Sequence, residues 1–219
     1  MLTIITGHYG SGKTTLAVNL AVKAAKEGKK TAVADLDIVN PFFRAADSLP
    51  LFEELGIETV IPYGANTNLE SVYLPPEVEK LFYEDGERIL DVGGDDDGAI
   101  VLGRYADKIK AVGYEMICTV SRYRPFTKTP AEAAEMIKAI ETASGLTVTG
   151  IANTSSLGDE TDFETVAASV KYAEETARLS GKPLLYTAVM EPLWSGLTEK
   201  QKADIGEAFP VTIYTKRLF

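Results

Sequence analysis

The sequence predicts an α/β fold in three layers, a mostly parallel, twisted sheet with helices on both faces. Short β-branched runs alternate along the chain with helical patterns, and this alternation is typical of parallel strands joined by helical crossovers. The strand candidates are almost continuously apolar, as expected where both faces of a strand are buried. Polar, glycine-rich segments repeatedly follow the strands, at the sheet edge where α/β proteins bind ligands.

The strand candidates follow one another at regular intervals. Leu2–Thr6 leads into a glycine-rich turn and a helix from about Lys13 to Glu27, which Gly28 ends. Thr31–Leu36 is the second strand candidate and ends in an acidic loop. The remaining candidates are Ile57–Ile61, Arg88–Val92, Met116–Ser121, Thr147–Asn153, Leu184–Val189 and Val211–Thr215.

Helical patterns fill most of the gaps between these strands. The clearest runs from Pro130 to Ala143, where apolar residues recur at the three- and four-residue spacing of one buried face. Thr129 is a suitable capping residue before it, and proline fits the first helical position. Another helix is expected over Phe163–Leu179. Because no linker or repeat interrupts the pattern, we expect residues 1–219 to form a single domain.

Composition excludes several classes of protein. The chain has 22 Lys and Arg against 32 Asp and Glu, a net charge of −10, which disfavours non-specific binding to nucleic acid or anionic membranes. One cysteine and one histidine exclude an intramolecular disulfide and a multi-ligand Cys/His zinc site. The apolar setting of Cys118, with no leader-like start or membrane-length apolar run, predicts a cytoplasmic protein.

The turn after the first strand matches the phosphate-binding pattern G-x-x-x-x-G-K-S/T from Gly7 to Thr14. Glycines let the backbone N–H groups converge on one anion, assisted by the dipole of the following helix. Lys13 would bring a charge to the β- and γ-phosphates, and the Thr14 hydroxyl would bind Mg²⁺. The position of the motif between a strand and a helix is the context that this chemistry requires.

Carboxylates follow two further strands. Asp91 ends an apolar strand and has a glycine, Gly94, three residues later, so it would support magnesium through water while the Gly94 N–H senses the terminal phosphate. Asp35 and Asp37 are two residues apart on an extended segment and point to the same side. One would support the magnesium shell and the other orient the attacking water; alternatively, one of them caps the following turn.

These residues together resemble the MinD/ParA/nitrogenase-iron-protein branch of P-loop ATPases, which have the CobQ/CobB/MinD/ParA type of nucleotide-binding domain. The resemblance is carried by Thr6–Thr15, Leu16–Ala21 and Asp35–Asp37, and it is firm up to about Asn153. Within this branch, the chain is most similar to small bacterial ATP-binding proteins of undefined role. The resemblance implies a three-layer P-loop NTPase fold for the whole chain.

The resemblance also implies individual roles. Asp37 would lie in a first switch loop and position the hydrolytic water, and Asp91 would be the Walker B carboxylate that opens a second. Asn153 would read adenine through its amide. The implied catalytic residues are Lys13, Asp37 and Asp91, the metal ligands are Thr14, Asp35, Asp37 and Asp91, and the nucleotide contacts are Gly7, His8, Tyr9, Gly10, Ser11, Gly12, Lys13, Thr14, Thr15 and Asn153.

The sequence also indicates which base is bound, and it places its one histidine, His8, in the phosphate loop. The guanine-reading pattern N/T-K-x-D is absent, because Thr127–Pro130 lacks the aspartate, so we expect ATP with Mg²⁺ rather than GTP. His8 stands where members of this branch often carry a second lysine that reaches the partner's nucleotide across a dimer. A cationic imidazole would partly replace that lysine; alternatively, His8 is a bystander in a loop held by its backbone.

Three weaker features remain open. Asp95–Asp97 forms either part of the second switch or a solvated turn capping a helix that starts near Gly98. The aromatic residues of Asn40–Arg44 serve packing or docking. Trp194 either borders the adenine or fills the core.

We therefore expect a Mg²⁺-dependent ATPase switch, slow without its unknown protein partner, with a homodimer across the nucleotide site and no nucleic-acid or membrane partner. One alternative is a small-molecule kinase or a ligase resembling dethiobiotin synthetase, with Arg44, Arg122 and Arg124 as acceptor anchors. Another is a nucleotide-sensing module without useful turnover.

Overall fold

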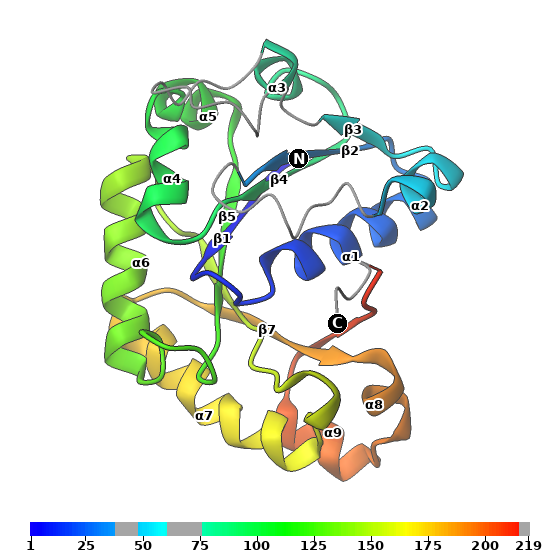
Figure 1. The fold of residues 1–219 in the computed structure, drawn as a ribbon, viewed down its shortest axis with the longest axis vertical. Helices are drawn as coiled ribbons and strands as arrows, with labels where there is room; N and C mark the ends of the chain where they lie inside the picture. Colours follow the sequence, from blue (N-terminus) through cyan, green and yellow to red (C-terminus); the bar gives the residue numbers. More distant parts are fainter. Residues whose placement is uncertain (38–47, 61–75, 215–219) are drawn as a thin grey trace.

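The structure is a computed structural model that describes residues 1–37, 48–60 and 76–214 (Figure 1). In this part of the chain, eight strands form one parallel sheet in the order β3-β2-β4-β1-β5-β6-β7-β8. The predicted fold class is confirmed. The strands are β1 (Leu2–Gly7), β2 (Thr31–Leu36), β3 (Glu58–Val60), β4 (Glu87–Val92), β5 (Glu115–Val120), β6 (Gly150–Asn153), β7 (Leu184–Met190) and β8 (Ala208–Val211).

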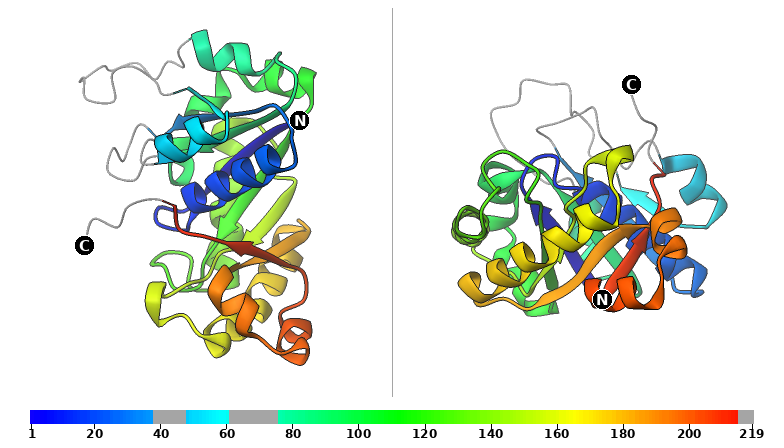
Figure 2. Two further views of the ribbon diagram at one scale, coloured as in Figure 1. Left: turned by 90° about the vertical axis from the view of Figure 1, so that its right-hand side faces the viewer. Right: turned by 90° about the horizontal axis from the view of Figure 1, so that it is seen from below.

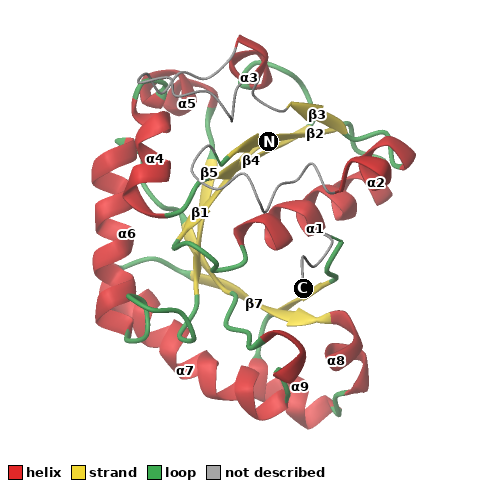
Figure 3. Cartoon of the chain, viewed as in Figure 1, coloured by secondary structure: helices red, strands yellow, loops and turns green. Residues whose placement is uncertain are grey.

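Helices connect successive strands and cover both faces of the sheet (Figure 3). Capping residues mark the starts of the two helices predicted at Pro130 and Phe163. Thr129 and Glu132 form a capping box at one, and Asp162 caps the other. The helices are α1 (Lys13–Lys26), α2 (Leu49–Glu54), α3 (Pro76–Leu81), α4 (Asp95–Gly103), α5 (Ala106–Val112), α6 (Pro130–Ser144), α7 (Phe163–Ser180), α8 (Glu191–Gly196) and α9 (Glu199–Ile205), with a 3₁₀ turn at Gly158–Glu160.

Alternation along each strand divides the core into two layers. Ile4 and its equivalents belong to the apolar cluster under α3, α4, α5, α6 and α7, whereas Ile5 and its equivalents pack against α1 and α2. A third cluster, which includes Trp194, joins α7 to α8 and α9. Figure 2 shows these last helices, in orange, beside the red strand β8 at one end of the sheet. Trp194 is partly buried and packs against this cluster, and it is not among the residues that line the cavity described below.

Two predicted strands differ from those observed. The last strand ends, rather than begins, at Val211, and it includes Pro210. Proline removes a ladder hydrogen bond and is tolerated on an edge strand, which β8 is. The strand predicted from Thr147 begins only at Gly150. Asn40–Arg44, Ile61 and Thr215 lie outside the described residues.

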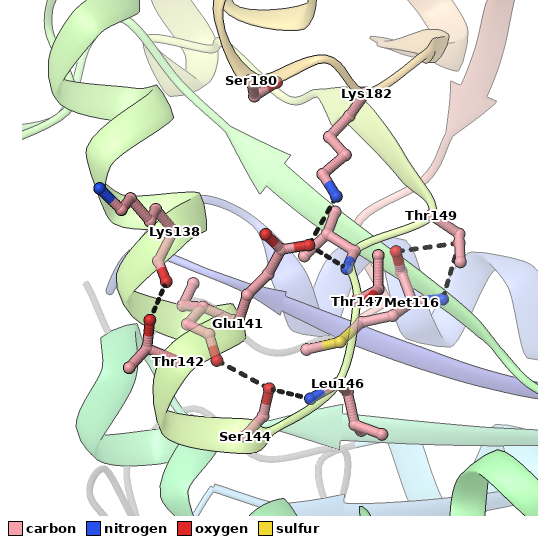
Figure 4. Close-up of polar contacts among 12 residues, drawn as sticks. Met116, Lys138, Glu141, Thr142, Ser144, Leu146, Thr147, Thr149, Ser180 and Lys182 are labelled. Atoms are coloured by element: carbon pink, nitrogen blue, oxygen red, sulfur yellow. Dashed lines mark hydrogen bonds and ion pairs between the residues drawn. The ribbon is translucent and has the colours of Figure 1, made fainter.

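The amino ends of the central strands are held by a polar network (Figure 4). Glu141 of α6 accepts hydrogen bonds from the Lys182 ammonium, at 2.6 Å, and from the Val148 amide, at 2.8 Å. The Thr149 hydroxyl bonds both backbone groups of Met116 at the start of β5. These contacts fix the connections into β6 and β7 and leave the opposite, carboxyl edge of the sheet for the glycine-rich loops. None of the described helices is long and apolar enough to cross a membrane.

Candidate functional site

The predicted phosphate loop joins β1 to α1 at the centre of the carboxyl edge of the sheet. The φ angles of Gly7, Gly10 and Gly12 are 139°, 70° and 89°, and residues other than glycine rarely adopt such positive values. Gly7 is also irreplaceable for space, since a Cβ there would lie 2.4 Å from the Thr119 carbonyl oxygen. A hydrogen bond between the Ser11 and Thr119 hydroxyls, at 2.6 Å, ties the loop to β5.

Lys13 begins α1 and lies on the floor of the loop. Its side chain is only 6% exposed, and within the described residues its ammonium group donates one hydrogen bond, to the His8 carbonyl oxygen at 3.1 Å. No side chain caps the first turn of α1, whose N-cap is Gly12. A buried ammonium with no ion-pair partner among the described carboxylates and an uncapped helix N-terminus both favour a bound anion.

Asp91 is a buried carboxylate near the end of β4, the strand beside β1. Both of its oxygens are inaccessible, and neither has a hydrogen bond of normal geometry to any described residue. Burial and then the charge of Asp35 raise the pKa of Asp91 to about 7, while the Thr14 hydroxyl and the Lys13 ammonium oppose the shift. A carboxylate held in this way is suited to a cation or to the water ligand of a cation.

Asp35 and Asp37 have different environments. Asp35 pairs in register with Asp91 across β2 and β4, and its carboxylate accepts a hydrogen bond from the Asp37 amide at 3.0 Å. Asp37 is more exposed, and of the two it is the one that lines the cavity described below. Among the described residues no three His, Cys, Asp or Glu side chains form a metal cluster by themselves.

The loop after β4 touches the phosphate loop. A Cβ on Gly94 would lie 2.9 Å from the Tyr9 amide nitrogen, and a Cβ on Gly93 would lie 3.2 Å from a carboxylate oxygen of Asp37. Gly93 and Gly94 thus allow this loop to contact both the phosphate loop and the loop after β2. The three segments are therefore in direct contact.

The acidic run Asp95–Asp97 is the first turn of α4, which starts three residues before the predicted position. Carboxylates at a helix N-terminus interact favourably with the helix dipole, which explains the clustering without a metal. Asp95 has an additional role, because it accepts a hydrogen bond of 2.5 Å from Nδ1 of His8. His8 is therefore not a free side chain in the loop: it connects the loop to α4.

A cavity of about 380 Å³ lies above these segments. Its phosphate end is formed by Tyr9–Leu16 and Asp37, and its other end is lined by residues of β7 and β8 and by the segment that follows β6. The second end combines hydroxyl groups with aliphatic side chains. Its lining residues are Thr154, Ser155, Ser156, Gly158, Thr161, Val166, Ala188, Val189, Met190, Val211 and Ile213.

Asn153 lies beneath this end of the cavity and does not line it. Its side chain is fully buried, donates to the Ser169 and Thr187 hydroxyls at 2.9 and 3.4 Å, and accepts from the Ser155 amide at 3.2 Å. These contacts tie the end of β6 to α7, to β7 and to the segment that follows β6. Its predicted contact with adenine remains a prediction from the resemblance, while Thr154–Ser156 form the surface of the cavity.

Asn19 was not anticipated as part of the site. From α1 it exchanges two hydrogen bonds with the backbone of Thr212, donating to the carbonyl oxygen at 2.8 Å and accepting from the amide at 2.9 Å. The neighbouring residues Val211 and Ile213 line the cavity. Asn19 therefore holds one wall of the cavity against the helix that follows the phosphate loop. The two residues are 193 positions apart, so no local pattern could reveal the pair.

Cys118 has no chemical role of this kind. It is buried in β5, and burial raises the pKa of its thiol to about 12, which leaves it a protonated core residue.

Comparisons with known proteins agree with this geometry. Residues 2–170 match the family model described as the CobQ/CobB/MinD/ParA nucleotide binding domain. An uncharacterised ATP-binding protein of Methanocaldococcus jannaschii is 57% identical over 37 residues, which span 17% of this chain and 14% of that protein.

Solved structures with a similar fold include the cell division protein FtsY of Thermotoga maritima, with a TM-score of 0.57 and 19% identity over 94% of this chain. The signal recognition particle 54 kDa protein of Aeropyrum pernix, in complex with GDP, has a TM-score of 0.55 and 15% identity over 85%. The chain spans 63% and 40% of these two structures. At such identities the similarity shows the fold alone.

Proposed function

Because the chain belongs to the CobQ/CobB/MinD/ParA family of nucleotide-binding domains, we propose that it binds ATP with Mg²⁺ and hydrolyses it as a switch that acts on a protein partner. The observation that carries the proposal is the Lys13 ammonium, buried beside an uncapped helix N-terminus at the phosphate end of the cavity. A triphosphate would supply an anion in direct contact with this ammonium group, whose hydrogen bond within the described residues is to the His8 carbonyl oxygen.

Each polar residue around the loop has a definite task in this proposal. Lys13 and the loop amides bind the β- and γ-phosphates and neutralise charge that develops between them. Asp37 orients the attacking water from the wall of the cavity, and Asp35 fixes Asp37 through its amide. Thr14 and Asp91 would hold Mg²⁺, which when bound neutralises the phosphate oxygens. The unpartnered oxygens of Asp91 fit that ion's hydration shell.

The composition of the far end of the cavity supports adenine over guanine. Guanine presents two adjacent N–H donors, which a carboxylate accepts well. The described residues that line this end carry hydroxyl or aliphatic side chains and no carboxylate. The Ser and Thr hydroxyls both donate and accept, as the edge of adenine requires.

A partner would read the loops at the mouth of the cavity. Gly94 and Gly93 link the loop after β4 to Tyr9 and Asp37, so a change at the terminal phosphate is transmitted to α4. Tyr9 and Phe126 are 52% and 80% exposed on this side, and such exposed aromatic groups suit a protein surface. The proposed partner is a protein. It is either a different protein or a second copy of this chain that binds across the nucleotide.

Phosphate release from ATP and GTP, with and without Mg²⁺, tests the proposal. We expect slow Mg²⁺-dependent release from ATP that exceeds release from GTP. Light scattering on the same samples, with ADP as the control, reports whether ATP joins two chains. Tight ATP binding with no release would favour the sensing module instead, and stimulation by small alcohols, amines or acids would favour the kinase or ligase. Absence of nucleotide binding would contradict all three.

A further inference from the structure

The side chain of Arg124 lies beside the phosphate loop, and its positive charge has no ion-pair partner among the described residues. A Cβ placed on Gly10 would be 3.4 Å from both Cζ and Nε of Arg124, so the guanidinium group packs directly over this glycine. Arg124 also lines the cavity. In the part of the chain that the structure describes, its guanidinium group has no hydrogen bond and no carboxylate partner. Only its backbone amide is engaged, with the Ser121 carbonyl oxygen.

Arg122, two residues earlier, has the opposite environment. Its guanidinium group donates a hydrogen bond to the Ala168 carbonyl oxygen of α7 and lies over the ring of Tyr123, 5.5 Å from the ring centroid. Arg122 does not line the cavity. Of the two arginines that the sequence places after β5, Arg122 is therefore structural and Arg124 faces the site.

The loop that carries Arg124 is fixed at several points. The Thr127 hydroxyl donates to the Ser121 carbonyl oxygen at 2.9 Å, and the Tyr172 hydroxyl donates to the Thr127 carbonyl oxygen at 2.7 Å. The Tyr123 hydroxyl donates to the Thr165 carbonyl oxygen at 2.9 Å. Because these contacts hold the backbone on α7 and β5, the guanidinium group is presented from a rigid support, which reduces the entropy lost when it binds a ligand.

We propose that Arg124 binds the phosphate chain of the nucleotide, from the same chain that supplies the phosphate loop. The inference rests on the proposed nucleotide function and adds a second cation to it. Lys13 would hold the phosphates from the floor of the loop and Arg124 from its rim beside Gly10. The planar guanidinium fork matches two phosphate oxygens, so the contact is specific for phosphate rather than for the base.

Equilibrium titrations of Arg124→Ala with ATP, ADP, adenosine and inorganic tripolyphosphate test the inference. A charge-assisted contact predicts an affinity for ATP and tripolyphosphate that is lower by about 10- to 100-fold, with adenosine unaffected. The salt dependence of ATP binding should also become weaker. Loss for ATP alone places Arg124 on the terminal phosphate, and equal loss for ADP places it on the phosphates that ADP retains.

Arg122→Ala is the matched control, expected to bind all four probes as the wild type does. Arg124→Lys should recover part of the affinity, because it keeps the charge and loses the fork. Equal binding of ATP by Arg124→Ala and the wild type would overturn the inference and leave the proposed function intact. If the wild type itself binds no nucleotide, it is the proposed function that fails. Unchanged thermal midpoints would show that both variants are folded.

Discussion

The imidazole of His8 donates a hydrogen bond from Nδ1 to a carboxylate oxygen of Asp95, 2.5 Å away, and so joins the phosphate loop to the first turn of α4. The pair is partly buried, with side-chain exposures of 14% for His8 and 34% for Asp95. The ring of Phe126 packs edge-on against the imidazole, 6.1 Å between centroids. The single histidine of the sequence thus connects the phosphate loop to α4.

Double-mutant analysis of this pair provides the first prediction. His8→Phe keeps an aromatic ring against Phe126 and removes the donor, and Asp95→Asn removes the charge. Urea unfolding of the wild type, both single variants and the double variant should give a coupling energy of about 1 kcal/mol, because the bond is partly exposed. Strictly additive effects would mean that the contact contributes nothing to the stability of the folded chain.

Asp91 predicts an unusual dependence of stability on pH. Its pKa is raised from 3.8 to about 7 in the folded chain, so the folded state holds a proton that the unfolded state releases. This contribution to stability is present at low pH and is lost as the pH rises from the ordinary value through the raised one. At about 1.4 kcal/mol per pKa unit, roughly 2–3 kcal/mol is lost between about pH 5 and 8.

The measurement is the free energy of unfolding of ligand-free wild type and Asp91→Asn at both pH values. The variant should lack this loss, so its stability relative to the wild type should rise by the same amount. Asp96→Asn, an exposed carboxylate in the first turn of α4, is the control. Parallel pH profiles for wild type and Asp91→Asn would show that Asp91 is ionised normally.

Gly94 should be intolerant of the smallest side chain. Its backbone angles are those of ordinary extended chain, so Gly94→Ala carries no conformational strain and acts only through contact with Tyr9. We expect the displaced phosphate loop to lower the rate of ATP hydrolysis at least 10-fold, since small misplacements at reacting groups are costly. Gly196→Ala is the matched control, because a Cβ there meets nothing within 4 Å. Equal rates for the two variants would refute the proposed coupling.

Asn19 should support the base end of the cavity. Asn19→Leu has similar size but releases both hydrogen bonds to Thr212, which flanks the lining residues Val211 and Ile213. We expect affinity for ATP to fall about 10-fold while affinity for inorganic tripolyphosphate stays the same. Competition titrations with both ligands measure this difference. An equal fall for both ligands would mean that the change disturbs the phosphate loop and not the wall.

The sequence predicted well what depends on local pattern. The fold class, the phosphate loop and the strand-end positions of Asp35, Asp37 and Asp91 follow from periodicity, glycine spacing and the rule that ligands bind at the carboxyl edge. The start of α6 was predicted from its capping residue, Thr129. The residues that make up each such signal lie within a few positions of one another, so the local structure that they predict is kept in the folded chain.

What the sequence missed depends on contacts between distant segments. Arg122 and Arg124 look equivalent along the chain, and only the positions of Ala168 and Gly10 distinguish them. The pairing of Asn19 with Thr212 is of the same kind. In β8, a proline that usually argues against a strand is accepted because the sheet ends there.

The most direct test of the nucleotide site is the affinity of wild type, Lys13→Ala and Lys26→Ala for Mg·ATP, measured by isothermal titration. Lys26 is an exposed lysine in the last turn of the same helix and controls for charge and helix content. Lys13→Ala should lose affinity by roughly 100-fold or more, because the buried cation is the main counter-charge for the phosphates, while Lys26→Ala should match the wild type. Undiminished binding of Mg·ATP by Lys13→Ala would contradict the placement of the triphosphate in this cavity.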